Sequence, residues 1–308
     1  MKIIFMGTPD FAVPCLEKVV QSGHDVCAVY TNPDKPKGRG YELSQSPVKQ
    51  KALQYNIPVV QPKTLKNVDV QKEIVGFRPD VIVVVAYGKI LPKAVLDIPK
   101  YGCINVHGSL LPKYRGAAPI QWSVINGEEV TGVTTMYMNE GLDTGDILLQ
   151  EKTSIGSDET SKELFDRLCI MGADLLDKTL SKLQDGKLKS TKQNDEFATY
   201  APMLDKSMSK IDWTRSARDV HNLVRGLNSW PGAVTTFDGK TLKIHRTKVC
   251  KGYKGEPGQL CDTDNGIVMC ADAAVELIEV QPVGKKKMSG KDFLRGKRLD
   301  KCKEYVFE

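Results

Sequence analysis

The chain has 308 residues, of which 41% are hydrophobic, and this is enough for two sizeable cores rather than a single domain. The longest hydrophobic run, residues 81–86, is far too short to cross a membrane, so we expect no membrane partner. The formal net charge of +6 lies in the last third, because residues 1–200 hold 24 basic and 24 acidic side chains, whereas residues 201–308 hold 20 and 14. A basic C-terminal region that follows a neutral N-terminal region favours a polyanionic partner. An excess of six basic residues is also explained by solubility alone.

Strand and helix patterns alternate over residues 1–187. Repeated β-α-β units of this kind predict a mostly parallel sheet in a Rossmann-like domain. Thr8 and Ser46, each followed by a proline, are interpreted as helix N-caps, and Asp158 as the N-cap of a long helix. We expect strands at 2–7, 25–31, 57–60, 80–87, 102–107, 132–138 and 147–155, and helices after Thr8, after Ser46, and at about 65–75, 118–125 and 158–183.

The pattern changes towards the C-terminus. Hydrophobic periodicity fades around residues 188–206, which we interpret as a linker. Short β-prone runs separated by turn residues then predict a small OB-like β-barrel over residues 207–308, and Asp238-Gly239 predicts a tight hairpin within it. We expect a short helix at 219–227 and strands at 233–237, 242–249, 258–261, 266–270 and 275–280.

The eight cysteines form no C-x-x-C pair and show no metal-ligand spacing with the four histidines. Several lie in hydrophobic runs, so we expect reduced and mostly buried thiols, a cytoplasmic location and no metal. We also expect no signal or transit peptide before the first strand. The turn after that strand lacks G-x-G-x-x-G, and the sequence contains no G-x-x-x-x-G-K-[ST] loop, which argues against a nicotinamide enzyme or an NTPase.

Asn105 and His107 are the most informative polar pair. They are two residues apart at the end of the expected strand 102–107, so their side chains share one face. Ligands of open α/β sheets bind at the carboxyl ends of strands. An amide that can donate to an oxyanion, beside a histidine that can stabilise it or move a proton, predicts a catalytic pair. A lone histidine at a strand end is more often structural.

A carboxylate is needed to orient His107. Asp143 lies in a turn between two β-prone runs, from which it could reach a neighbouring strand end. By itself such an aspartate is more often a turn residue. Asp146 is the competing choice, and spacing does not separate the two.

Longer motifs resemble the 10-formyltetrahydrofolate-dependent formyltransferases. Further motifs, above all those near the C-terminus, narrow this resemblance to members that formylate methionine on initiator tRNA. The first set is N-x-H-x-S-L-L-P at 105–112, R-G-A-A-P-I at 115–120 and G-L-D-T-G at 141–145; the second is F-x-G-T-P-D-F-A at 5–12, V-V-A-Y-G at 84–88, I-D-W at 211–213 and Q-P-x-G-K-K-x-M at 281–288.

The resemblance implies that Asn105, His107 and Asp143 form the catalytic set. The α-amine of methionine would attack the formyl carbon carried on N10 of the folate. The formyl group arrives activated, so 10-formyltetrahydrofolate is the expected donor and no metal is needed. The resemblance assigns the folate to Ser109, Leu110, Leu111 and Pro112, and a hydrophobic pterin slot to Val84, Val85, Ala86 and Tyr87; core packing is the alternative interpretation of the second group.

The resemblance also implies contacts with tRNA. The loop 31–41 carries Lys35, Lys37 and Arg39 among prolines and glycines, and in the family this insertion enters the acceptor end of the tRNA. Its residues vary among relatives, which leaves its fine specificity open. Lys285, Lys286 and Lys287 form a compact cationic cluster, and a second basic stretch runs from Lys240 to Lys254. Lys240, Arg246, Lys248 and Lys254 would share one face only if no bulge interrupts the strand.

Two other functions remain to be weighed. One is an enzyme that formylates a small amine, such as glycinamide ribonucleotide or an amino sugar nucleotide, or that hydrolyses formyl-folate. The other is a non-catalytic RNA-binding protein. The basic C-terminal region disfavours the first, and the intact Asn105, His107 and Asp143 disfavour the second. No sustained heptad or long apolar stripe indicates an oligomer, so we expect a monomer.

Overall fold

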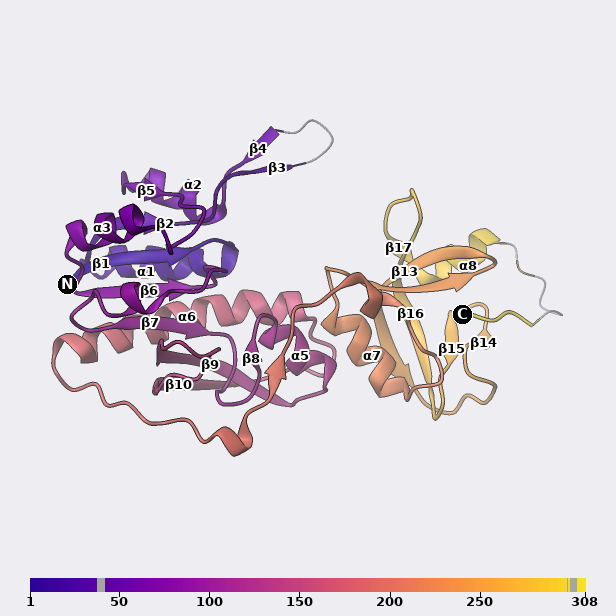
Figure 1. The fold of residues 1–308 in the computed structure, drawn as a ribbon. Coiled ribbons are helices and arrows are strands. Elements are labelled where there is room, and N and C mark those ends of the chain that lie inside the picture. The colour runs from indigo at the N-terminus through magenta and orange to yellow at the C-terminus, as the bar shows by residue number, and fades with distance from the viewer. Residues whose placement is uncertain (38–41, 298, 300–303) are drawn as a thin grey trace. The chain divides into compact units, whose positions relative to one another are not determined.

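The computed structural model describes residues 1–37, 42–297, 299 and 304–308, which divide into two compact units (Figure 1). The first unit comprises Met1–Gly116, Thr131–Thr153 and Phe165–Tyr200. The second comprises Ala117–Val130, Ser154–Leu164 and Ala201–Glu308. Every helix among these described residues is too short or too polar to span a membrane.

The first unit is built on a seven-stranded sheet with the order β10-β9-β7-β6-β1-β2-β5. The pairs β1–β2, β1–β6, β2–β5 and β6–β7 are parallel, whereas β7–β9 is antiparallel, so the predicted mostly parallel Rossmann-like sheet is confirmed. Strand order reverses between β1 and β6, which is where open α/β sheets bind ligands. The strands are β1 (Lys2–Gly7), β2 (Asp25–Tyr30), β5 (Val59–Val60), β6 (Val81–Val85), β7 (Cys103–His107), β9 (Val130–Tyr137) and β10 (Ile147–Ser154).

The helices of this sequence region follow the expected alternation. Their residues are spaced so that one side packs on the sheet; Cys15, Leu16 and Val19 of α1 are buried in this way. A hairpin formed by β3 (Lys35–Lys37) and β4 (Glu42–Ser44) extends away from the sheet (Figure 1). The helices are α1 (Val13–Gln21), α2 (Pro47–Gln54), α3 (Val68–Phe77), α4 (Lys93–Leu96) and α6 (Ser161–Gln184), with short 3-10 turns at Asp10–Ala12 and Asp195–Phe197.

Two of the three expected N-caps are wrong. Thr8 does not cap a helix because its hydroxyl donates to the Tyr87 carbonyl at 3.2 Å. Asp158 does not cap α6 either, since Thr160 and Glu163 form a capping box two residues later: Glu163 accepts from the Thr160 N–H at 2.9 Å, and Thr160 accepts from the Glu163 N–H at 3.3 Å. Ser46 does cap α2, accepting from the Lys49 N–H at 3.1 Å.

The second unit contains an antiparallel sheet with the order β12-β13-β16-β15-β14, and β17 pairs with β16. Its two edges are joined by the C-terminal residues: Glu308 exchanges backbone hydrogen bonds with Thr236 of β12, and Phe307 donates to Gly258 just before β14. The sheet is therefore closed, as expected for an OB-like barrel. Its strands are β12 (Ala233–Phe237), β13 (Lys240–Cys250), β14 (Leu260–Asp262), β15 (Ile267–Met269), β16 (Ala274–Pro282) and β17 (Met288–Ser289).

The barrel core contains aromatic side chains that meet across the closure. Phe237 stacks on Phe307 at 4.4 Å between ring centroids, and Trp213 lies 5.9 Å from Phe307. The expected hairpin at Asp238-Gly239 is present, with both residues at positive φ. Helices α5 (Pro119–Ile125), α7 (Ala217–Gly226) and α8 (Gly290–Lys297) complete this unit.

Candidate active site

Strand β7 places Asn105 and His107 at the carboxyl edge of the first unit's sheet. Asn105 is paired with Val84 of β6, and His107 with Thr134 of β9. His107 is buried, with 5% of its surface exposed, whereas Asn105 is half-buried. Within the described part of the chain, the Asn105 amide has no hydrogen-bond partner. An unengaged amide beside a buried imidazole is available to a ligand.

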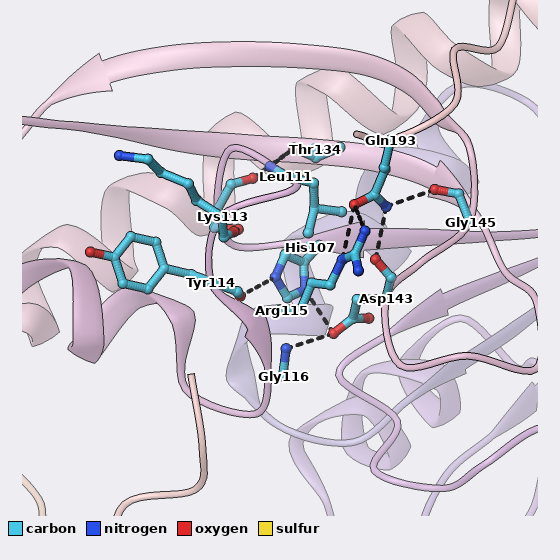
Figure 2. A network of polar contacts seen from close by, with 11 residues as sticks. His107, Leu111, Lys113, Tyr114, Arg115, Gly116, Thr134, Asp143, Gly145 and Gln193 are labelled. Atoms are coloured by element: carbon cyan, nitrogen blue, oxygen red, sulfur yellow. Dashed lines mark hydrogen bonds and ion pairs between the residues drawn. The ribbon is translucent and has the colours of Figure 1, made fainter. Parts of the chain in front are cut away.

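The two ring nitrogens of His107 have different environments (Figure 2). Nε2 lies 2.9 Å from the Tyr114 carbonyl oxygen, which only accepts, so Nε2 carries a proton. Nδ1 faces Asp143, 3.7 Å from its Oδ2 atom. That separation is longer than a hydrogen bond. Nδ1 is therefore the ring atom that can exchange a proton on the side of the carboxylate.

Asp143, rather than Asp146, is the carboxylate beside His107. Its Oδ2 atom accepts a hydrogen bond from the Gly116 N–H at 2.8 Å, and its backbone adopts the left-handed region with φ 53°. Asp146 instead accepts from the Ser190 hydroxyl at 3.2 Å. Residue spacing did not distinguish Asp143 from Asp146, whereas the backbone conformation of the turn does.

Two glycines shape the turn that carries Asp143. A Cβ on Gly145 would lie 1.8 Å from the Tyr137 carbonyl oxygen, and one on Gly141 would lie 2.1 Å from the Thr144 hydroxyl. Both distances are far below van der Waals contact. The G-L-D-T-G motif therefore allows the Tyr137 backbone to approach Gly145 and the Thr144 side chain to approach Gly141, on either side of Asp143.

The segment 109–112 is fixed by Thr134 and Gln150. The Thr134 hydroxyl donates to the Ser109 carbonyl at 2.6 Å and accepts from the Leu111 N–H at 3.2 Å. Gln150 donates to the Leu111 carbonyl at 2.9 Å. The peptide bond between Leu111 and Pro112 is cis. These contacts give the segment a defined backbone conformation beside His107.

Residues 84–87 lie mainly in the core. Val84, Val85 and Tyr87 are buried, and Ala86 is exposed with φ 47°. Burial raises the pKa of Tyr87 to about 12, and its hydroxyl has no hydrogen-bond partner among the described residues. Core packing is therefore present for three of the four, and their contribution to a pterin slot stays a prediction.

The base of the β3–β4 hairpin is fixed by polar contacts. Asn32 donates to the Tyr87 carbonyl at 2.9 Å and to the Thr8 hydroxyl at 3.1 Å. Asp34 forms an ion pair with Lys49 at 2.6 Å, which holds the pKa of Asp34 below its ordinary value, and Gln61 bonds both. A cleft of about 300 Å³ opens here, lined by Thr8, Pro9, Asn32, Pro33, Lys35 and residues 44–47.

The expected tRNA-contacting residues are only partly described. Lys35 is exposed on β3, Lys37 belongs to the same strand, and Arg39 lies outside the described residues. Burial, and to a lesser extent the charge of Lys35, lowers the pKa of Lys89. Lys35 and Lys89 therefore lie close enough for their charges to interact.

The lysine cluster after β16 is exposed. Lys285, Lys286 and Lys287 follow β16, and Lys287 forms an ion pair with Glu279 at 2.9 Å. Strand β13 is bulged around residues 244–247, so the condition for Lys240, Arg246, Lys248 and Lys254 to share one face is not met. Arg246 is exposed but pairs with Glu163 at 2.5 Å.

Sequence analysis assigned no role to Gln193 and Arg115, which are part of the network in Figure 2. Arg115 is buried, donates twice to Gln193, and forms an ion pair with Asp195 at 2.7 Å. Gln193 in turn donates to the carbonyl of Asp143. Arg115 was visible in the R-G-A-A-P-I motif, whereas Gln193 lies in the region interpreted as a linker. Among the residues described, no cluster of histidine, cysteine and acidic side chains is arranged to hold a metal ion.

The sequence matches two family descriptions. Residues 1–180 match "Formyl transferase", and residues 203–298 match "Formyl transferase, C-terminal domain". The chain is 50% identical over 304 residues to the methionyl-tRNA formyltransferase of Alkaliphilus oremlandii, covering 98% of each chain. It is also 50% identical over 302 residues to that of Geobacter metallireducens, covering 97% of each.

Solved structures share the fold at low sequence identity. An N-formyltransferase from Helicobacter canadensis, in complex with folinic acid and dTDP-3-aminofucose, superposes with a TM-score of 0.70 at 20% identity, covering 90% of this chain and 99% of the other. HypX from Aquifex aeolicus, in complex with tetrahydrofolic acid, gives a TM-score of 0.62 at 17% identity, covering 100% of this chain and 51% of the other.

Proposed function

The chain belongs to the formyl transferase family, and we propose that it transfers the formyl group of 10-formyltetrahydrofolate to the α-amino group of methionine on initiator tRNA. The observation that carries this proposal is the juxtaposition of Asn105, His107 and Asp143 at the carboxyl edge of the sheet. The chain matches both family descriptions, one in each part. It is also 50% identical over nearly its whole length to enzymes named methionyl-tRNA formyltransferases.

The reaction needs stabilisation of an oxyanion and movement of one proton. The methionine nitrogen forms a bond to the formyl carbon, and the carbonyl oxygen gains negative charge. The carbon–N10 bond then breaks, N10 takes up a proton, and the products are formylmethionyl-tRNA and tetrahydrofolate. We assign the oxyanion to the unengaged Asn105 amide and to His107, because donors that face a developing charge lower the barrier most.

Asp143 orients His107 and assists loss of the amine proton. With Nε2 donating to the Tyr114 carbonyl, Nδ1 is the ring atom left to take up a proton, and once protonated it can donate to the oxyanion. Asp143 is anchored by the Gly116 N–H, which leaves its carboxylate between the backbone and the imidazole. Ser109, Leu110, Leu111 and Pro112 are assigned to the folate, and their fixed backbone conformation supports this assignment.

The tRNA is assigned to the β3–β4 hairpin and to the basic barrel. Lys35, Lys37 and Arg39 are proposed to contact the acceptor end, and Lys285–Lys287 the phosphate backbone, so affinity falls as salt rises. This assignment divides the chain into a catalytic domain at 1–187, a linker at 188–206 and a tRNA-binding domain at 207–308. We propose that the enzyme acts as a monomer in the cytoplasm.

A small-amine acceptor is the second candidate. It is favoured by the superposition on a formyltransferase in complex with a dTDP-amino sugar, but at 20% identity this likeness shows the fold alone. The relatives at 50% identity over nearly the whole chain favour the tRNA acceptor.

The test is formyl transfer from 10-formyltetrahydrofolate to methionyl initiator tRNA, with methionyl elongator tRNA and small amines as parallel acceptors. Selective transfer to the initiator is expected. Transfer only to a small amine would retain the catalytic set and overturn the tRNA assignment. Hydrolysis of the donor without transfer to any acceptor would leave the alternative activity of a formyl-folate hydrolase.

A further inference from the structure

Residues 190–199 connect the two backbone segments that surround His107. On one side, Thr191 exchanges backbone hydrogen bonds with Ile147 at 2.8 Å, directly after the turn of Asp143. On the other side, the Thr199 hydroxyl accepts from the Tyr114 N–H at 2.9 Å, and the Thr199 carbonyl accepts from the Arg115 N–H at 2.8 Å. The segment is therefore fixed at Thr191 and at Thr199 to the backbone around the site, although its sequence resembles a linker.

Gln193 lies at the centre of this segment and uses both ends of its amide. Its Oε1 accepts from Arg115 Nε at 3.1 Å and from Arg115 Nη2 at 2.8 Å. Its Nε2 donates to the carbonyls of Asp143 at 2.8 Å and of Gly145 at 2.7 Å (Figure 2). Because Arg115 only donates, it holds Oε1 on its own side and turns the two amide protons towards the turn.

The position of Asp143 depends on such support. Its left-handed backbone is unfavourable for most residues, and its carboxylate must meet both the Gly116 N–H and His107. The two hydrogen bonds from Gln193 fix the carbonyls on either side of Thr144, and with them the direction of the Asp143 side chain. Both bonds go to backbone carbonyls of the turn.

We propose that Gln193 is a positioning residue for the formyl transfer reaction, oriented by the buried Arg115 and acting through Asp143. This inference rests on the proposed catalytic role of Asp143. It assigns to the predicted linker a direct part in setting kcat, separate from any contribution to tRNA binding.

The test uses Gln193→Glu and Gln193→Met in the full-length enzyme. Glutamate keeps, and strengthens, the pairing with Arg115 but turns a carboxylate oxygen towards the two carbonyls. Methionine has a similar size and loses both sets of contacts. We expect both variants to lower kcat for methionyl initiator tRNA on the order of 10²-fold, because small displacements of reacting groups have large effects on rate. The KM values for folate and tRNA should change less than about threefold, as expected for a defect in the chemical step.

The matched control is Asn194→Asp, which makes the same amide-to-carboxylate change one residue later. Asn194 is exposed and caps the following 3-10 turn through an oxygen that aspartate retains. We expect this variant to keep wild-type kcat. Loss of kcat in Gln193→Met alone, with Gln193→Glu unaffected, would show that only the pairing of Arg115 matters and would overturn the proposal.

A double variant separates positioning from general stability. In an Asp143→Ala background, Gln193→Glu should cause no further loss of kcat, because its route to the reaction is already removed. A further loss equal to that in the wild-type background would overturn the proposal. If Asp143→Ala alone retained full kcat, the assignment of the site itself would fail, and this outcome is distinguishable from failure of the Gln193 inference. Thermal unfolding of each variant shows whether it is folded at the assay temperature.

Discussion

His107 in the first unit and His221 in the second have similar surroundings. Both are buried, both have Nε2 within hydrogen-bonding distance of a backbone carbonyl, and both have a carboxylate nearby. For His221 these are the Ser157 carbonyl at 3.0 Å and Asp158 at 3.5 Å.

The two histidines differ in their Nδ1 atoms. His221 Nδ1 lies 3.0 Å from the Thr247 hydroxyl, so the neutral imidazole has both nitrogens satisfied. Among the residues that the structure describes, His107 Nδ1 has no such partner, and the Asn105 amide on the same strand is unengaged. His107 Nδ1 faces Asp143, whose side chain is only 15% exposed. Burial and a nearby carboxylate therefore do not identify a catalytic histidine. An unsatisfied ring nitrogen that faces a fixed carboxylate does so better.

Replacing His107 should have the largest effect. We expect His107→Ala to lower kcat by about two orders of magnitude or more, because it removes a group assigned to the oxyanion and to proton movement. Formyl transfer to methionyl initiator tRNA in a single turnover measures the chemical step. Near-normal turnover, with the variant folded, would remove His107 from the mechanism and make it a second structural histidine.

Replacing His221 should have the opposite pattern. His221→Ala leaves the Thr247 hydroxyl and the Ser157 carbonyl without their partner and opens a cavity. We expect a loss of about 2–3 kcal/mol in the free energy of unfolding, with kcat of the folded protein unchanged within about threefold. Chemical denaturation and the same transfer assay, run on one preparation, distinguish this result from a catalytic role.

The sequence predicted the His107 strand because period-two spacing and a hydrophobic run determine which side chains share a face. It could not separate Asp143 from Asp146. Their directions depend on a left-handed residue and on close approaches to Gly145 by the backbone and to Gly141 by the Thr144 hydroxyl, which residue spacing does not encode. The cap of α6 was available from the sequence, since Thr160 and Glu163 have the capping-box spacing that Asp158 lacks.

Other features depend on contacts between distant residues. The barrel is closed by residues 305–308, which pair with strands far earlier in the chain, and no local pattern indicates this. Gln193 was missed for a related reason. Its partners on the Asp143 turn are backbone carbonyls, which every residue possesses, so only the fading periodicity of an extended segment was visible in the sequence.

The pH dependence of the free energy of unfolding should reveal the lowered pKa of His221. Burial is the main cause that lowers its pKa below 6.5, assisted by Arg225 and Arg218 and opposed by the Ser157 carbonyl and Asp158. The unfolded chain therefore binds a proton more readily than the folded one. The stability that neutral His221 contributes is complete above about pH 6.5 and is lost as pH falls towards the folded-state value.

The measurement compares the unfolding midpoints of wild type and His221→Gln from pH 8 to pH 5. Because glutamine does not titrate, the gap between the two proteins should narrow below about pH 6.5. The wild-type slope alone is insufficient, since burial also lowers the pKa values of His24 and His245. A gap that stays constant across this range would contradict the assignment of the titration to His221.

Replacing Asp158 should have the smallest effect. The side chain of Asp158 is 66% exposed, and its Oδ1 atom lies 3.5 Å from His221 Nε2. The two side chains form an ion pair only when the imidazole is protonated. Burial keeps His221 neutral at pH 7.5, so Asp158→Asn should change the free energy of unfolding by less than about 0.5 kcal/mol there. Chemical denaturation at that pH measures the change. A loss above about 1 kcal/mol would mean that His221 is charged in the folded protein. The contrast with His107 would then rest on Asn105 and the site around it rather than on the protonation of the His221 imidazole.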